Sequence, residues 1–202
     1  MSGHQRRTVL TGLGAGLVLA GAARAADAPV ARTTAGRVRG YLDDGISAFR
    51  GIRYGASTAG RRFQPPVAPE PWADVREATA YGPASPQRNG AVGTVSEDCL
   101  FLNVWTPALR DGGKRPVMVY IHGGAYSTGS GSSPLYDGIH LCRRGDVVVV
   151  SLNHRLNAFG YAYLARLAPG FADSGNAGQI DLCWRSSGLR TTSPSSAATR
   201  PR

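Results

Sequence analysis

An α/β fold is predicted because strand-like, glycine-rich and helix-like segments alternate in the middle of the chain. Residues 116–121 (PVMVYI) form a short apolar run of strand-forming types, which predicts a buried strand that ends at paired glycines. A short helix is predicted over 137–144. Residues 146–153 (DVVVVSLN) are apolar without alternation, which is typical of a strand buried on both faces of a parallel sheet. Strand, loop, helix and strand in this order indicate an α/β domain.

The residues before this unit predict further strands. Residues 30–53 alternate short β-like runs with turn signals at 35–36 and 43–45, which predicts a small antiparallel meander. Residues 56–87 are rich in Pro, Arg and Gly, so we expect an irregular surface crossing with Trp72 as its apolar anchor. Residues 96–107 (SEDCLFLNVWTP) predict a strand that is entered through acidic residues.

The net charge of +10 comes from the two ends of the chain. Removing seven terminal arginines from the 23 basic residues leaves 16 against 13 acidic ones, a net charge of +3. No basic stripe with interleaved aromatic residues remains, so nucleic acid is not an expected partner. The seven arginines are Arg6, Arg7, Arg24, Arg185, Arg190, Arg200 and Arg202.

Residues 1–25 resemble a bacterial twin-arginine export signal. Arg6 and Arg7 precede a mildly apolar run over 8–23, and Ala23-Arg24-Ala25 supplies an A-x-A cleavage site. A membrane anchor is the alternative, but this run is short and glycine-rich for a bilayer span. We therefore expect no stable membrane span and an exported protein, periplasmic or secreted, that starts near Ala26.

The three cysteines predict neither a disulfide framework nor a metal site. Cys99, Cys142 and Cys183 are odd in number, and their spacing matches no metal-binding pattern. Cys99 and Cys142 are interpreted as small buried apolar residues, the commoner role of a lone cysteine.

A series of short motifs identifies a family. SEDCL-x-LNV and NHRL-x-x-x-G, in that order, are highly specific together. The full series is ISAFRGI at 46–52, RF at 62–63, PW at 71–72, SEDCLFLNV at 96–104, HGGAY at 122–126, NHRL at 153–156, and DSGN at 173–176 with Gly178 and Asp181. In this order the motifs resemble the type-B carboxylesterases, the α/β-hydrolase branch that includes para-nitrobenzyl esterases and cholinesterases. The resemblance covers about residues 30 to 181.

The resemblance implies the N-terminal part of an α/β-hydrolase fold: a small antiparallel meander followed by strands of the central sheet. The implied activity is hydrolysis of a small carboxylic ester through an acyl-serine intermediate, without metal or cofactor. The N–H groups of Gly124 and Ala125 correspond to donors that bind the oxyanion, and one such donor is typically worth about 3 kcal/mol. Tyr126 either lines the acyl pocket or packs under the loop.

The resemblance also implies two ion pairs. Arg62 matches the family arginine that pairs with the glutamate of SEDCL, here Glu97. Arg155 matches the family arginine that pairs with the aspartate found here at Asp181. Both pairs would hold loops near the active site, and solvated surface charge is the alternative interpretation of these residues. Losing one partner of a buried pair costs several kcal/mol.

Other motif residues are given structural roles. Ser85 stands near the position where some relatives have the disulfide partner of the SEDCL cysteine, so we expect Cys99 to be a free buried thiol. His122, His140 and His154 do not occupy the family's catalytic position. His122 and His154 are interpreted as hydrogen-bonded structural residues.

No serine in the sequence has glycines at both positions of G-x-S-x-G, and 127–133 (STGSGSS) comes closest. We therefore expect the nucleophile, catalytic acid and catalytic histidine to be absent, and residues 26–182 to be truncated before the nucleophile strand. Residues 183–202 are expected to be a disordered tail, with a frameshift in an esterase gene as the hypothesis for its origin. The downstream DNA would test it. A non-catalytic binding remnant, or a fragment complemented by a separate C-terminal fragment, is the alternative function.

Overall fold

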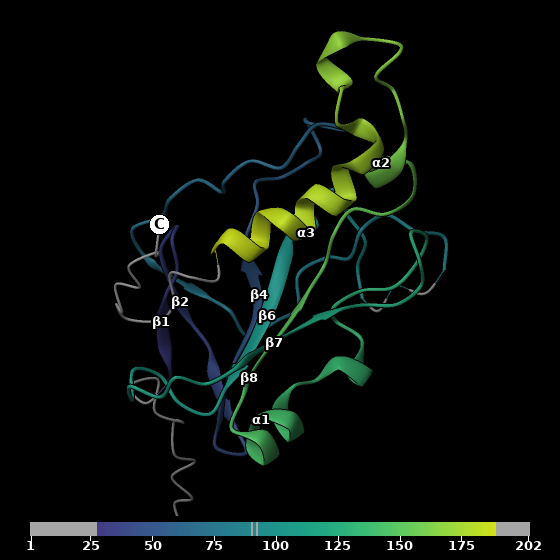
Figure 1. Ribbon diagram of the computed structural model, residues 1–202. Helices are drawn as coiled ribbons and strands as arrows, with labels where there is room; N and C mark the ends of the chain where they lie inside the picture. Colours follow the sequence, from purple (N-terminus) through teal and green to yellow (C-terminus); the bar gives the residue numbers. More distant parts are fainter. Residues whose placement is uncertain (1–27, 90, 92, 189–202) are drawn as a thin grey trace, which may run out of the picture.

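The computed structural model describes residues 28–89, 91 and 93–188 (Figure 1). The predicted leader (1–25) and residues 189–202 of the predicted tail lie outside them. None of the described helices is both long and apolar enough to cross a bilayer.

Two sheets form the molecule, which confirms the α/β class. The larger sheet has the order β3-β4-β6-β8-β7, in which β7 and β8 are parallel and the other neighbours are antiparallel. Its strands are β3 (Tyr41–Asp43), β4 (Ile46–Arg53), β6 (Phe101–Thr106), β7 (Val117–Ile121) and β8 (Val148–Leu152). The smaller sheet has the order β1-β2-β5, with β1 (Val30–Arg32), β2 (Arg37–Arg39) and β5 (Val75–Glu77).

The predicted meander divides between these sheets. Its two turns form hairpins, β1 with β2 and β3 with β4. Asp44 and Gly45 have φ angles of 50° and 79°, as a two-residue hairpin turn requires. The chain passes from one sheet to the other at Gly40, where a Cβ atom would lie 2.2 Å from the Ala48 carbonyl oxygen. Strand β5 lies inside the segment that was predicted to be irregular; its three residues are too few to show a pattern.

Strand β7 corrects the prediction of a buried strand over 116–121. Its five residues are exposed, from 44% at Val119 to 52% at Ile121. The cause is its position: in the described part of the chain β7 pairs only with β8 and forms the edge of the sheet. The predicted burial of β8 is confirmed, because Val149–Leu152 are at most 3% exposed, but the sheet around it is mixed: β8 is parallel to β7 and antiparallel to β6.

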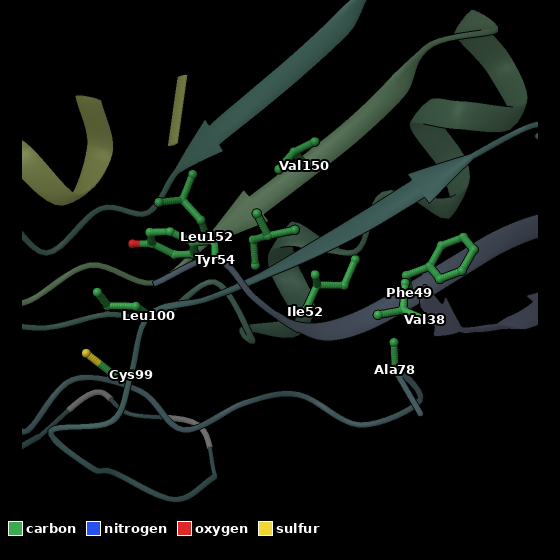
Figure 2. Close-up of a cluster of buried hydrophobic side chains, with 10 residues drawn as sticks. Val38, Phe49, Ile52, Tyr54, Ala78, Cys99, Leu100, Val150 and Leu152 are labelled. Atoms are coloured by element: carbon green, nitrogen blue, oxygen red, sulfur yellow. The ribbon is translucent and has the colours of Figure 1, made fainter. Parts of the chain in front are cut away.

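The main apolar core lies against β4, β6 and β8. Figure 2 shows Ile52, Val150 and Leu152 from β4 and β8 among its buried side chains. Trp105 is fully buried in a second cluster that includes Cys142 of α1 (Ile139–Gly145). Trp72 packs against the first cluster from the long crossing, as predicted, and its Nε1 donates to the Arg37 carbonyl oxygen at 2.9 Å.

Helix α1 occupies the predicted position between β7 and β8. The other helical segments are η2 (Pro134–Tyr136), α2 (Asn157–Tyr161), η3 (Pro169–Phe171), η4 (Ser174–Asn176) and α3 (Ala177–Gly188). In the view of Figure 1, α2 and α3 lie above the sheet and α1 lies below it. Helix α3 includes the first six residues of the stretch 183–202, for which disorder was expected. Residues 183–187 (CWRSS) contain no proline or glycine that would interrupt the helix.

Candidate active site

The loop that follows β7 turns back on itself at Gly124. Gly124 has φ 104°, and a Cβ atom there would lie 2.2 Å from the carbonyl oxygen of Thr128. The Gly124 carbonyl oxygen accepts hydrogen bonds from the N–H groups of Ser127 and Thr128, both at 3.2 Å. A side chain at 124 would therefore break the turn, so this position requires glycine.

The turn leaves two backbone donors available. Within residues 28–89, 91 and 93–188, no acceptor is hydrogen-bonded to the N–H of Gly124 or Ala125, and both residues are exposed. Ala125 has φ 52°, an uncommon left-handed conformation for a residue with a Cβ atom. Successive N–H groups around a left-handed residue form a concave site that favours anions.

Side chains from outside fix the loop. Gln87 holds Gly129 with two hydrogen bonds: its Nε2 donates to the carbonyl oxygen at 2.9 Å, and its Oε1 accepts from the N–H at 2.8 Å. Asn157 at the start of α2 donates from Nδ2 to the Ser127 carbonyl oxygen at 3.0 Å. Its backbone N–H donates to the Tyr126 carbonyl oxygen at 2.7 Å. The polypeptide around the two free donors is therefore held in one position.

Two buried asparagines fix the end of the loop to the sheet. Asn103 of β6 donates from Nδ2 to the Gly131 carbonyl oxygen at 3.2 Å and to Ser151 Oγ at 3.0 Å. Asn153, just after β8, accepts from the Gly131 N–H at 2.7 Å and donates to the Pro83 carbonyl oxygen at 2.8 Å. Neither residue was predicted as part of the site, although both occur in the family motifs. Their signal in the sequence was a polar amide in or beside an apolar strand.

His122 and His154 stack beneath this region, with ring centroids 4.8 Å apart and an interplanar angle of 13°. Each Nδ1 lies 3.0 Å from the carbonyl oxygen of the following residue, Gly123 or Arg155, to which its N–H donates. Burial lowers the pKa of both imidazoles. For His154, burial and then the neighbouring His122 lower the pKa to about 4. Both rings are neutral near pH 7.

The side chain of Tyr126 is exposed and does not pack under the loop. The residue is 63% exposed, and its ring centroid is 4.6 Å from that of Tyr161 in a tilted arrangement. Its side chain is open to a ligand that approaches the N–H groups of Gly124 and Ala125.

The predicted ion pairs form, but in different environments. Arg155 Nε donates to Asp181 Oδ2 at 2.9 Å and Nη2 donates to Oδ1 at 2.7 Å, with both side chains at most 2% exposed. Arg62 binds Glu97 through two hydrogen bonds of 2.6 and 2.5 Å, but its side chain is 55% exposed. Arg62 lowers the pKa of Glu97. The first pair is buried, whereas the second lies at the surface, with Arg62 exposed and the Glu97 side chain 18% exposed.

Cys99 is a buried thiol outside any disulfide. Burial raises its pKa to about 12, so it stays protonated and is a poor nucleophile. Ser85 is also buried, and its Oγ accepts from the Leu156 N–H at 3.0 Å. His140 is exposed in α1 and is not part of the stacked pair. The described residues contain no group of three metal-binding side chains.

Comparison with known proteins settles the family. The sequence profile of the Carboxylesterase family matches residues 27–184, which include the loop, the stacked histidines and both ion pairs. The chain belongs to the carboxylesterase family. This confirms the resemblance drawn from the motifs.

Individual carboxylesterase relatives support the assignment over the same region. The chain is 41% identical over 160 residues to the para-nitrobenzyl esterase of Bacillus subtilis, covering 75% of this chain and 32% of that protein. It is 44% identical over 144 residues to the phenmedipham hydrolase of Pseudarthrobacter oxydans, covering 66% and 29%. The chain thus spans about a third of the length of these relatives.

Solved structures give the same fold. A carboxylesterase of Geobacillus stearothermophilus matches with a TM-score of 0.75 and 42% identity, covering 81% of this chain and 34% of that structure. An esterase of Clostridium hathewayi matches with a TM-score of 0.76 and 42% identity, covering 82% and 35%. These neighbours are esterases of the α/β-hydrolase fold, so the described strands correspond to an N-terminal part of that fold.

Proposed function

We propose that this carboxylesterase chain supplies the oxyanion-binding part of a serine hydrolase that cleaves small carboxylic esters. The observation that carries the proposal is the pair of N–H groups of Gly124 and Ala125, which have no hydrogen-bond acceptor in the described part of the chain. They lie on a loop that Gln87 and Asn157 hold in place. The region matches the carboxylesterase family in both sequence and fold.

The chemistry follows from where negative charge develops. When a serine oxygen attacks an ester carbonyl, the carbonyl oxygen becomes an anion in the tetrahedral intermediate. Two fixed N–H donors bind this anion more strongly than the neutral carbonyl, so they lower the barrier and do not merely bind substrate. Removing one such donor typically lowers kcat about 10²–10³-fold.

We also propose that residues 1–202 alone do not complete this reaction, because no serine among them stands in G-x-S-x-G. The experiment has two arms, each with p-nitrophenyl butyrate as substrate. The first arm is the chain itself, which should release no burst of p-nitrophenol. A stoichiometric burst that a serine-hydrolase inhibitor abolishes would contradict this.

The second arm is a chimera in which residues 27–182 replace the matching segment of the Bacillus subtilis para-nitrobenzyl esterase. We expect the chimera to hydrolyse the ester and Gly124→Ala to lower its kcat about 10²-fold or more, because the added Cβ displaces the donors. Gly170→Ala is the matched control, since a Cβ there meets no atom within 4 Å. A folded chimera in which both variants have the same kcat would overturn the proposed role of the loop.

Complementation by a separate C-terminal fragment is a second candidate function, and the exposed β7 favours it. An apolar edge strand can pair with a strand from another polypeptide. Co-expression with the C-terminal fragment of the same Bacillus esterase should restore hydrolysis if this is correct. Co-purified but inactive fragments, or fragments that do not associate, would exclude complementation.

We propose export through the leader at residues 1–25, on the pattern of Arg6 and Arg7 before the apolar run. A reporter fused after Ala26 should reach the periplasm. Replacing both arginines by lysine should block this export, and unchanged export of that variant would contradict a twin-arginine route.

A further inference from the structure

The stacked imidazoles of His122 and His154 connect the loop to the parallel strands. His122 directly follows β7 and His154 follows β8 by two residues. The backbone of Gly129 lies against the His122 ring, because a Cβ atom there would be 2.5 Å from Nδ1 and 3.1 Å from Cε1. The loop thus begins at one ring of the stack and passes back over it.

The hydrogen bonds of the stack determine which nitrogen of each ring can take up a proton. Each Nδ1–H is used by a neighbouring carbonyl oxygen, so in the neutral ring Nε2 carries the lone pair. A proton can bind only at Nε2. It would place a positive charge in a ring that is at most 5% exposed and 4.8 Å from a second imidazole.

No facing acid compensates such a charge. The charged groups on the adjoining segments are Arg155, next to His154, and Asp181 of α3, which pair with each other. Among the residues that the structure describes, no carboxylate acts electrostatically on either imidazole. Acid therefore weakens this arrangement.

We propose that the His122–His154 stack is a pH-sensitive positioning element that holds the 122–129 loop closed only while both rings are neutral. Protonation of either ring forces the stack apart and moves the loop, and with it the N–H groups of Gly124 and Ala125. The effect on the oxyanion site rests on the proposed function. The conformational change itself does not, and the experiment measures that change without an ester.

The size of the effect follows from linkage. The pKa of His154 is about 4 in the stack against an ordinary value of 6.5. Because this depression favours the neutral ring, the contribution to loop stability is complete above pH 6.5 and is lost as the pH falls through about 4. One pKa unit is a tenfold change in an equilibrium constant, so opening becomes on the order of 100-fold more frequent by pH 4 and approaches about 300-fold below it.

The experiment uses the full chain and two NMR measurements between pH 7 and pH 3.5. The first is the titration of the histidine Cε1–H resonances, which should show His154 ionising near pH 4 and His122 ionising below the ordinary imidazole pKa of 6.5. The second is amide hydrogen exchange at Ser127 and Thr128, whose N–H groups donate to the Gly124 carbonyl oxygen. Their protection factors should fall on the order of 100-fold as the buried rings titrate.

His154→Asn is the test variant, because its amide can still donate to the Arg155 carbonyl oxygen but cannot take up a proton. It should make the pH dependence of exchange at Ser127 and Thr128 shallower, because, of the stacked pair, only His122 can still take up a proton. His140→Asn, in an exposed position, should leave the dependence unchanged. A His154→Asn profile identical to that of the unmodified chain, or buried histidines that titrate near 6.5, would overturn the proposal. If the variant does not fold, the unmodified chain decides: exchange at Ser127 and Thr128 that does not rise as the buried rings titrate would overturn the proposal.

Discussion

Replacing Asp181 by Asn should strongly destabilise the protein, because it leaves the Arg155 guanidinium buried without a counter-charge. Asp181 accepts from Arg155 Nε, Nη2 and the backbone N–H at 2.7–3.0 Å, and the two side chains are 0% and 2% exposed. An Asn side chain keeps the shape, but it carries no charge and turns an N–H group toward one of these donors. Breaking a buried pair in this way costs about 3–5 kcal/mol.

Urea denaturation followed by tryptophan fluorescence measures this loss. With an m-value of about 2 kcal/mol/M, the midpoint should fall by roughly 2 M. Glu77→Gln is the matched control. Glu77 pairs with Arg39 at the surface, where the Arg39 and Glu77 side chains are 37% and 57% exposed, so this pair should contribute at most about 1 kcal/mol to the free energy of unfolding. The reasoning would be refuted if the two variants lowered the midpoint equally. Arg155→Met with Asp181→Leu should recover part of the loss, because no isolated charge remains buried.

Two further predictions concern the loop and the thiols. Gly124→Ala should lower the free energy of unfolding by about 1–3 kcal/mol because of its φ of 104° and the Thr128 contact. Gly123→Ala, where a Cβ meets nothing within 4 Å, should have little effect; equal melting temperatures would contradict the strained turn. At pH 8, Ellman's reagent should modify the exposed Cys183 of the native chain rapidly, and the two buried thiols only after unfolding. Rapid reaction of Cys99, despite its pKa of about 12, would show that its burial is not maintained in solution.

The sequence predicted correctly those strands and turns whose conformation depends mainly on residues close by in the chain. The valine run at 146–153 contains β8. The predicted turn at 43–45 forms through Asp44 and Gly45, which both adopt the left-handed conformation. The apolar run at 116–121 was misassigned as buried for a non-local reason. Its composition suits burial, but whether a strand is central or at an edge depends on which strands pair beside it, and composition does not carry that information.

For the candidate site, the sequence pointed to the loop but not to the side chains that fix it. The paired glycines and the family motif indicated the donors at Gly124 and Ala125, but the residues that hold them were missed. Gln87 reaches Gly129 across 42 positions, and Asn103 reaches Gly131 across 28. Such contacts leave no periodic signal, because each side chain matters through one hydrogen bond to a distant backbone.

The conformation of Ala125 connects the fold to the proposed chemistry. A left-handed residue with a Cβ atom costs about 1–2 kcal/mol, which a glycine would avoid. The loop bears this cost because its neighbours leave no alternative: the Tyr126 carbonyl oxygen is bound by the Asn157 N–H, and the Ser127 carbonyl oxygen by Asn157 Nδ2. With those groups fixed, the N–H of Ala125 cannot turn inward to find a partner. The same contacts that impose the strain therefore keep both N–H groups available for the oxyanion-binding role that we propose.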